Sequence, residues 1–345
     1  MKKQNIINLV KFYVEKNDSA FRSEVSEIAL DFEKNGETEI SSYLMDLIST
    51  TNFYAPQNSY KDLYYLKKVN YMNSPLYLPE VIENDVIGFV RSINKKISIS
   101  KVLFHGKPGS GKTQSAFQIA RLLNRDILAV KMEDLIDSHL GQTSRNIVSL
   151  FEEIRHIPSH NVVILFDELD ALVMNRVCSN DLREMGRVTS TFLREFEQIP
   201  SNIIVIATTN LKDSLDKAIL RRFDANISFD RYTKEELIEI STMLLKSYLK
   251  LTETNKSDIR LFNKILKNLE IIPYPGDMQQ IIKIALAFSD ETEQYDYLRR
   301  LYLELNNHQM ADIIQLTKEG YTTREIEILT KVPKSSVSRK LKGGV

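Results

Sequence analysis

Short apolar runs alternate with helix-like stretches between about residues 85 and 232. Each run is continuously apolar instead of alternating with polar residues, as expected for strands that are covered on both faces. Strands that alternate with helices imply βαβ units and a parallel sheet. The pattern therefore predicts an α/β domain over 85–232, with strands at Val102–Phe104, Ile127–Val130, Val162–Phe166, Ile203–Ala207 and Ile227–Phe229.

The regions on either side of this domain have the spacing of amphipathic helices. In the first region, a looser stretch over about 51–80 contains Asn, Tyr and Pro and is typical of a linker. After the domain, Thr233 and Glu236 have the spacing of a capping box that would start a helix. We therefore expect a helical N-terminal domain and linker over 1–84, a second helical region over 233–306 and a separately patterned tail over 307–345.

Composition and charge narrow the classes of protein. The 345 residues include 46 Lys and Arg and 46 Asp and Glu, so the formal net charge is zero and any basic surface must be local. Cys178 is the single cysteine, which excludes an intrachain disulfide and fits a reducing cytoplasm. No apolar run approaches the roughly 20 residues of a membrane span, and the N-terminus lacks the pattern of a signal peptide. We expect a cytoplasmic protein with no membrane contact.

Residues 106–113 carry the most specific motif. Their sequence is Gly106-Lys107-Pro108-Gly109-Ser110-Gly111-Lys112-Thr113, which fits the phosphate-binding loop Gly-x4-Gly-Lys-[Ser/Thr]. The glycines let the backbone turn so that several N–H groups form a nest for an anion. Lys112 can then reach the β- and γ-phosphates, and the Thr113 hydroxyl can bind Mg²⁺. The motif predicts ATP and Mg²⁺ as cofactors.

Two later strands end in residues suited to nucleotide hydrolysis. Asp167 and Glu168 follow the apolar run 162–166, which predicts that Asp167 holds the Mg²⁺ shell and that Glu168 activates the attacking water. Asn210 follows the run 203–207 and is a candidate to position that water. An Asn that merely ends a strand and begins a turn is the ordinary alternative.

Arg221 and Arg222 are adjacent at the end of a short helical stretch. They are either a solvated pair of charges or arginine fingers that reach a neighbour's γ-phosphate. Fingers that act on a neighbouring subunit would require an oligomer.

The ordered set of GKPGSGKT, VVILFDELD, ATTN and LDKAILRRFD resembles the AAA subgroup of AAA+ ATPases over roughly 85–290. The resemblance implies a five-stranded sheet, a ring, usually a hexamer, and a helical lid, which is the helical region over 233–306. It implies that Asn210 is the sensor 1 residue and that Arg221 and Arg222 are fingers acting in trans. It also places Ile87 and Gly88 where the family holds adenine with backbone groups. Gly276-Asp277-Met278 resembles the family's Gly-Ala-Asp turn, shortened by one residue.

Relatives in this subgroup carry an aromatic-hydrophobic-Gly pore loop after the second strand. Here the corresponding frame is His139-Leu140-Gly141, with His in place of the aromatic residue. The resemblance implies that this loop grips a translocating polypeptide. A plain helix-to-turn connection is the alternative.

The tail resembles a helix-turn-helix of the resolvase or repressor kind. Its predicted recognition helix, near 334–342, would offer Lys334, Ser335, Ser336, Ser338 and Arg339 to DNA. Two positions depart from the motif: Glu327 stands where alanine is usual, and Lys331 stands where the tight turn usually has glycine. A basic helical tail that packs on the lid or on a neighbour is the alternative.

The stretch from Ile6 to Ile48 looks like the helical N-domain of certain bacterial AAA ATPases. Those proteins are encoded beside subtilisin-like serine proteases in plasmid-maintenance and anti-phage modules. Two functions follow from these resemblances: an ATP-hydrolysing ring that remodels a protein partner, such as a protease, or a DNA-associated ATPase or regulator that binds DNA through 307–345. A nucleotide-dependent scaffold with slow hydrolysis is a third possibility, against which the intact Glu168 argues.

Overall fold

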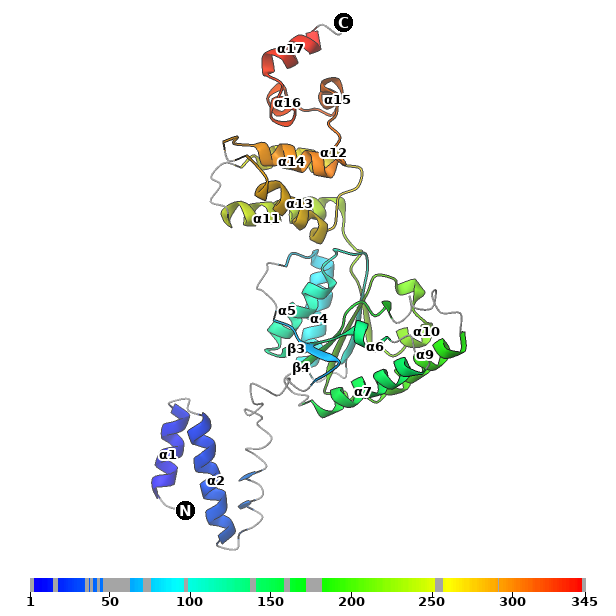
Figure 1. Ribbon diagram of the computed structural model, residues 1–345. Coiled ribbons are helices and arrows are strands. Elements are labelled where there is room, and N and C mark those ends of the chain that lie inside the picture. Colours follow the sequence, from blue (N-terminus) through cyan, green and yellow to red (C-terminus); the bar gives the residue numbers. More distant parts are fainter. Residues whose placement is uncertain are drawn as a thin grey trace. The chain divides into compact units, whose positions relative to one another are not determined.

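The computed structural model divides the chain into two compact units, Met1–Leu63 and Tyr64–Val345 (Figure 1). It describes residues 3–14, 18–34, 37, 40–41, 44–45, 63–70, 76–95, 99–136, 141–157, 162–171, 182–251, 257–290 and 292–342. In the first unit, helices α1 (Lys3–Val14) and α2 (Asp18–Lys34) pack together. Val25, Ile28 and Ala29 of α2 are buried in this pair. The spacing of these three residues places them on one face of the helix.

The second unit contains a six-stranded sheet with the strand order β1-β3-β4-β5-β2-β6. The five predicted strands are all present, and the pairs that they form with one another are parallel. Their bounds are β2 (Lys101–His105), β3 (Asp126–Val130), β4 (Val162–Phe166), β5 (Ile204–Thr209) and β6 (Ala225–Ser228).

The expected number of five strands is one too few. Strand β1 (Leu66–Lys68) adds an antiparallel edge beside β3, with Leu66 opposite Val130. Its three residues, Leu-Lys-Lys, have too little apolar pattern to predict a strand. Tertiary contacts hold it instead: the Glu153 carboxylate accepts the backbone N–H groups of Tyr64 and Tyr65, and Lys131 N–H donates to the Tyr65 carbonyl.

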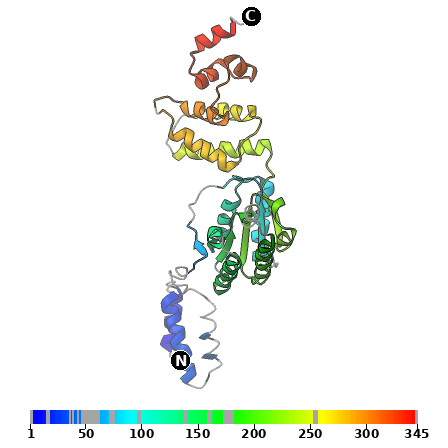
Figure 2. The ribbon, with the colours of Figure 1, turned by 45° about the vertical axis from the view of Figure 1, so that its right-hand side comes forward.

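Helices cover both faces of the sheet (Figure 2). Helices α4 (Glu80–Asn94) and α5 (Lys112–Leu122) pack on the face that includes Val163 and Leu165 of β4. Helices α7 (Gln142–His156) and α9 (Leu182–Glu197) pack on the opposite face, where Phe166 meets a cluster of phenylalanine rings. Both faces of β4 are therefore buried, as its continuous apolar run predicts. Helix α4 crosses the boundary expected after residue 84.

Short elements complete the region around the sheet. They are α6 (Met132–Leu135), the 3-10 helix η2 (Lys212–Ser214) and α10 (Lys217–Leu220).

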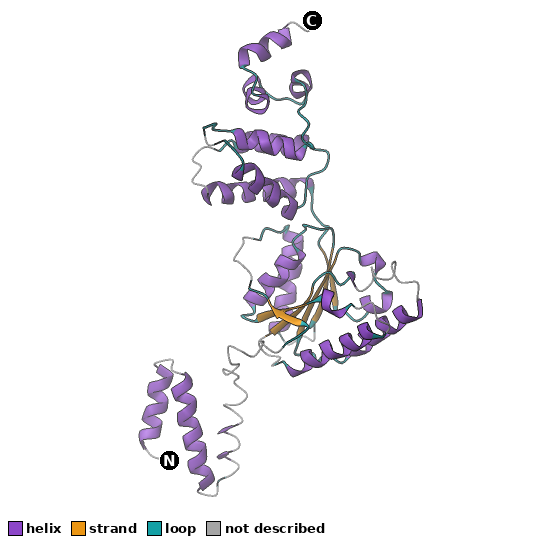
Figure 3. Cartoon of the chain, viewed as in Figure 1, coloured by secondary structure: helices purple, strands orange, loops and turns teal. Residues whose placement is uncertain are grey.

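After β6, the regular elements among the described residues are all helices, joined by loops (Figure 3). Four helices follow β6: α11 (Lys234–Leu251), α12 (Ile259–Asn268), α13 (Pro275–Ala287) and α14 (Asp296–Leu305). The predicted capping box at the start of α11 is present, because Thr233 N–H donates to the Glu236 carboxylate at 2.8 Å and Glu236 N–H donates to the Thr233 hydroxyl at 3.2 Å.

The tail forms α15 (Ile313–Lys318), α16 (Thr323–Thr330) and α17 (Lys334–Lys342). Leu316, Leu329 and Val337 of the tail are fully buried and belong to the same hydrophobic core as Leu298 and Leu301 of α14. The tail therefore packs on the lid instead of forming a separately tethered module.

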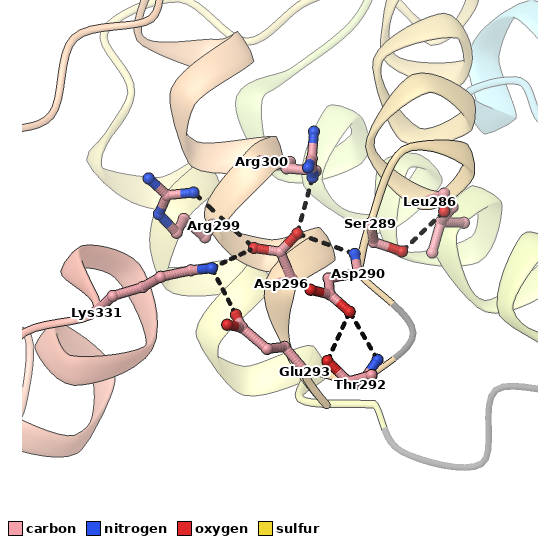
Figure 4. Close-up of polar contacts among 9 residues, drawn as sticks. All are labelled: Leu286, Ser289, Asp290, Thr292, Glu293, Asp296, Arg299, Arg300 and Lys331. Atoms are coloured by element: carbon pink, nitrogen blue, oxygen red, sulfur yellow. Dashed lines mark hydrogen bonds and ion pairs between the residues drawn. The ribbon is translucent and has the colours of Figure 1, made fainter.

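A buried carboxylate joins the tail to the lid (Figure 4). The side chain of Asp296 is 2% exposed and accepts hydrogen bonds from Arg300 Nε at 2.8 Å and from the Asp290 N–H at 3.1 Å. Lys331, in the turn before α17, reaches across to Asp296 at 3.5 Å and to Glu293 at 2.7 Å. Lys331 takes the left-handed φ of 61° that this turn requires. The Lys331 side chain is held by two acidic partners on the lid, Glu293 and Asp296.

We predict that Asp296→Asn weakens the lid and tail by about 2 kcal/mol at neutral pH, because it removes a buried charged acceptor. Burial raises the pKa of Asp296, but the Arg300 and Asp290 hydrogen bonds and the Lys331 charge together hold that pKa below its ordinary value of 3.8. Ionised Asp296 therefore stabilises the folded protein fully at pH values above its ordinary pKa. This stabilisation is lost as the pH falls through the lower pKa that Asp296 has in the folded protein.

Urea unfolding at pH 7 and at about pH 3.5 measures this effect. The difference in free energy of unfolding between wild type and Asp296→Asn should be smaller at the lower pH. The control is Asp312→Asn, since Asp312 is exposed and its side chain makes no capping hydrogen bond. A gap that is unchanged across pH contradicts the prediction.

Candidate nucleotide site

The phosphate-binding loop connects β2 to α5, as its sequence predicts. Gly109 and Gly111 adopt φ values of 73° and 96°, which side-chain-bearing residues rarely take, and Gly111 is the N-cap of α5. Lys112 is buried, and its Nζ donates to the carbonyls of Gly106 at 2.7 Å and Lys107 at 2.8 Å. Burial lowers the pKa of Lys112, and nearby acids, Asp230 foremost, oppose that shift. The ammonium group thus lies within the loop that would surround a triphosphate.

The two acids that follow β4 lie beside this loop. The Thr113 hydroxyl donates to Asp167 Oδ1 at 2.9 Å, which brings the two expected Mg²⁺ ligands together. A hydroxyl and a carboxylate are hard oxygen donors of the kind Mg²⁺ prefers, so these residues fit the ion. Glu168 is exposed and adopts φ 54°. Its side chain lines a cavity that also borders the phosphate-binding loop. Asp167 and Glu168 therefore both lie beside the phosphate-binding loop, and their roles in Mg²⁺ binding and water activation stay predictions.

Asn210 also lines this cavity, at the end of β5. Its backbone N–H donates to the Asp170 carboxylate at 3.2 Å, and Asp170 is buried. The parallel strands β4 and β5 are neighbours in the sheet, so their carboxyl ends bring Glu168 and Asn210 to one edge.

The cavity has a volume of about 370 Å³, and a second cavity of about 690 Å³ adjoins it. Leu76, Tyr77 and Ile240 line both. Ile87, expected near adenine, lines the second cavity, while Gly88 is exposed and is not among the described residues that line either one. Of the phosphate-binding loop, Pro108, Gly109, Gly111, Lys112 and Thr113 line the first cavity.

Three residues outside the motif hold the back of the loop. The Asp230 carboxylate accepts the Lys107 N–H at 2.7 Å, and the Tyr232 hydroxyl donates to the Ser110 carbonyl at 2.7 Å. Burial raises the pKa of Tyr232 far above its ordinary value, so the hydroxyl stays protonated and able to donate. From the first turn of α13, Gly276 N–H donates to the Gly109 carbonyl at 2.8 Å. The lid therefore contacts the phosphate-binding loop directly, at the turn that resembles Gly-Ala-Asp.

Arg221 and Arg222 lie in the turn between α10 and β6. Arg221 is exposed, and Arg222 forms an ion pair with Glu197 of α9. Neither arginine is among the described residues that line the two cavities. His139 and Leu140 of the expected pore loop lie outside the described residues, and Gly141 is the N-cap of α7.

Sequence reasoning missed Thr208, Asp170 and Tyr232 as parts of the site. Each is a common residue type at a strand end or in a connection. Its role in the site is visible only from the group to which it is hydrogen-bonded in the folded protein. The tyrosine's role depends on a carbonyl 122 residues away in the chain, for which the sequence has no local signal.

Residues 102–231 match the family described as "ATPase family associated with various cellular activities (AAA)". Over 132 residues the chain is 43% identical to an uncharacterized AAA family ATPase of Sinorhizobium fredii, which covers 38% of this chain and 39% of that protein. Over 298 residues it is 28% identical to the peroxisomal ATPase pex6 of Schizosaccharomyces pombe, covering 80% of this chain and 30% of that protein.

Among solved structures, the AAA domain of FIGL-1 in complex with ADP superposes with a TM-score of 0.51. The two chains are 19% identical, and the match covers 74% of this chain and 90% of that one. The family match lies within the second unit, whose fold is similar to that of an AAA domain. The chain spans well under two thirds of the length of the curated relatives named here. No helix among the described residues is long and apolar enough to cross a membrane.

We predict that Gly276→Ala weakens ATP binding about 10-fold, since a Cβ there would lie 2.8 Å from Gly109 Cα and would push the lid off the loop. Binding of a fluorescent ATP analogue measures the effect. Gly186→Ala is the matched control, because a Cβ at Gly186 meets nothing within 4 Å. Equal affinity in the two variants contradicts a role for the Gly276–Gly109 contact.

Proposed function

We propose that this protein is an oligomeric ATPase that hydrolyses ATP and remodels a protein partner. The observation that carries the proposal is the position of Glu168. Its exposed side chain faces the cavity beside the Thr113–Asp167 pair and the buried Lys112. A carboxylate beside the phosphate site is placed to accept a proton from an attacking water.

The site residues then have distinct roles. Lys112 and the loop N–H groups bind the β- and γ-phosphates, while Thr113 and Asp167 would hold Mg²⁺. When bound, Mg²⁺ neutralises charge on the phosphates. Glu168 takes the proton from water, and the Asn210 amide orients that water. Ile87 lies in the adjoining cavity, where the adenine ring would bind.

The two arginines support an assembly. Arg221 is exposed, and both arginines lie away from the described lining of their own chain's cavity. We therefore propose that they reach the γ-phosphate bound by a neighbouring subunit, in a closed ring that is a hexamer by analogy with the subgroup. Glu197 would then hold Arg222 until the neighbour's nucleotide attracts it.

The partner is proposed to be a protein. Relatives with this domain include peroxisomal ATPases and putative 26S proteasome regulatory subunit homologs, for example one from Methanocaldococcus jannaschii at 34% identity over 147 residues, covering 42% of this chain and 39% of that protein. The frame His139-Leu140-Gly141 is the proposed grip on the polypeptide. The likeness of Ile6 to Ile48 to ATPases encoded beside subtilisin-like proteases makes such a protease, in a bacterial defence or plasmid-maintenance module, the proposed client.

Subunit mixing tests hydrolysis and the arginine fingers together. Glu168→Gln keeps its fingers but loses its base, and Arg221→Ala/Arg222→Ala keeps its base but loses its fingers. We expect each alone to bind ATP and to hydrolyse it at least about 10³-fold more slowly than wild type. In an equimolar mixture the rate should recover substantially, because Glu168→Gln subunits supply fingers to intact sites.

A mixture no faster than the two separate proteins would show that the arginines do not act in trans. The control mixture pairs Glu168→Gln with Lys112→Ala, which has intact fingers but loses the lysine that would bind the phosphates. It should stay inactive. A wild type that binds ATP but never hydrolyses it would overturn the ATPase proposal itself.

One feature of the tail favours a second candidate function, DNA binding. Helix α17 lies exposed at one side of its three-helix arrangement, with Val337 buried and Ser335, Arg339 and Lys340 exposed. This is the arrangement in which a recognition helix presents polar and basic side chains to a major groove. Glu327 lies close to the start of this helix, where its carboxylate accepts the Lys334 N–H at 3.1 Å. That acid caps α17 and opposes a phosphate at the same point.

ATPase stimulation separates the two candidates. We expect an unfolded protein, casein, to raise the ATPase rate more than a 30-base-pair duplex does. If DNA is the partner, the duplex stimulates instead, and its binding falls steeply with salt. Arg339→Glu/Lys340→Glu would then abolish binding, while Lys246→Glu/Lys250→Glu, the same charge change on exposed residues of α11, would not. Stimulation by DNA alone contradicts the protein-remodelling proposal.

A further inference from the structure

Thr208, near the end of β5, binds the two catalytic-site acids at once. Its hydroxyl donates to Asp167 Oδ1 at 2.6 Å and accepts the Glu168 N–H at 3.0 Å. Its carbonyl accepts the N–H of Leu169 at 2.8 Å. Thr208 is 2% exposed. A threonine hydroxyl has one proton to donate, and here that proton is directed to the acid expected to hold the metal ion.

Glu168 needs such support because of its backbone. Its φ of 54° is left-handed, a conformation that non-glycine residues adopt only when their surroundings enforce it. The N–H groups of Glu168 and of Leu169 both end on Thr208, one on its hydroxyl and one on its carbonyl. These two hydrogen bonds fix the peptide planes on either side of Glu168 and so set the direction in which its side chain leaves the strand.

Asp167 is fixed in the same way. Its Oδ1 accepts hydroxyl protons from Thr113 and Thr208, which approach from two different elements, α5 and β5. These contacts restrict rotation of the carboxylate. The neighbouring Thr209 has a different role, because its hydroxyl accepts the Leu211 N–H at 3.0 Å. Of these two threonines, Thr208 is therefore the one whose hydroxyl connects Asp167 with Glu168.

We propose that Thr208 is a positioning residue for ATP hydrolysis. Its hydroxyl holds the Asp167 carboxylate and the Glu168 backbone in one arrangement, so that the base faces the attacking water. This inference rests on the proposed hydrolysis. Thr208 acts through Glu168 and Asp167, so its loss should slow turnover and leave nucleotide affinity nearly unchanged.

The test removes the Thr208 hydroxyl but keeps a β-branched side chain of similar size. Thr208→Val should lower kcat by about 10- to 100-fold, the effect of a misplaced catalytic group. The Kd for a fluorescent ATP analogue with Mg²⁺ should change less than about 3-fold, since the phosphate-binding groups are untouched. Thr208→Ser retains both hydrogen bonds and should keep most of the rate.

Two comparisons exclude a merely structural effect. Thr242→Val removes a buried hydroxyl from the lid that bonds to Asn263 at 2.7 Å, and it should leave kcat unchanged. Adding Thr208→Val to Glu168→Gln should cause little further loss, because the base that Thr208 helps to position is already absent.

The outcomes distinguish the inference from the proposed function. A wild type with no ATPase activity defeats the proposed function. An active wild type with a fully active Thr208→Val variant defeats only the role of Thr208. The role is also defeated if Thr208→Ser is as slow as Thr208→Val, or if Thr208→Val loses affinity and rate in equal measure. If Thr208→Val does not fold, Thr208→Ala provides the test, with Thr208→Ser as its rescue.

Discussion

The site depends on the pairing of parallel strands in one register. Because β2, β4 and β5 run in the same direction and are hydrogen-bonded side by side, their carboxyl ends meet at one edge of the sheet. The phosphate-binding loop, the two acids and Asn210 each follow one of these strands. A shift in register by one residue would turn each strand's side chains to the opposite face. The apolar packing on both faces therefore fixes the geometry of the site as well as the fold.

The lid is part of this site and not only a neighbour of it. Gly276 N–H is bonded to a carbonyl of the phosphate-binding loop, and Tyr232, in the connection to α11, is bonded to another. The tail shares the hydrophobic core of the lid, and Lys331 joins it to Asp296 and Glu293. A change in the loop on nucleotide binding thus has a continuous series of contacts through which to act on the lid and tail. A partner bound by the tail would act along the same contacts in reverse.

Two residues with left-handed backbone show how local rules give way to tertiary contacts. Lys331 and Glu168 have φ values of 61° and 54°, and each contacts residues distant in sequence. At Lys331 the partners are acids of the lid, and the result is a stable joint. At Glu168 the partner is Thr208, whose hydroxyl accepts the Glu168 N–H. Strain of this kind persists only where the surrounding structure overdetermines it.

The sequence by itself determined the α/β class, the five parallel strands, the phosphate-binding loop and the acids at the end of β4. It could do so because continuous apolar runs and a glycine-rich motif act over a few residues, where local pattern and structure agree. The start of α11 was predictable for the same reason, from a capping box four residues long. Only the tertiary structure decided that β1 joins the sheet, that the tail packs on the lid, and that Thr208, Asp230, Tyr232 and Gly276 support the site. Those contacts join residues tens to more than a hundred positions apart, between side chains and backbone groups common to any protein. No local pattern encodes such a pairing, because it exists only when the packed strands and helices bring its two ends together.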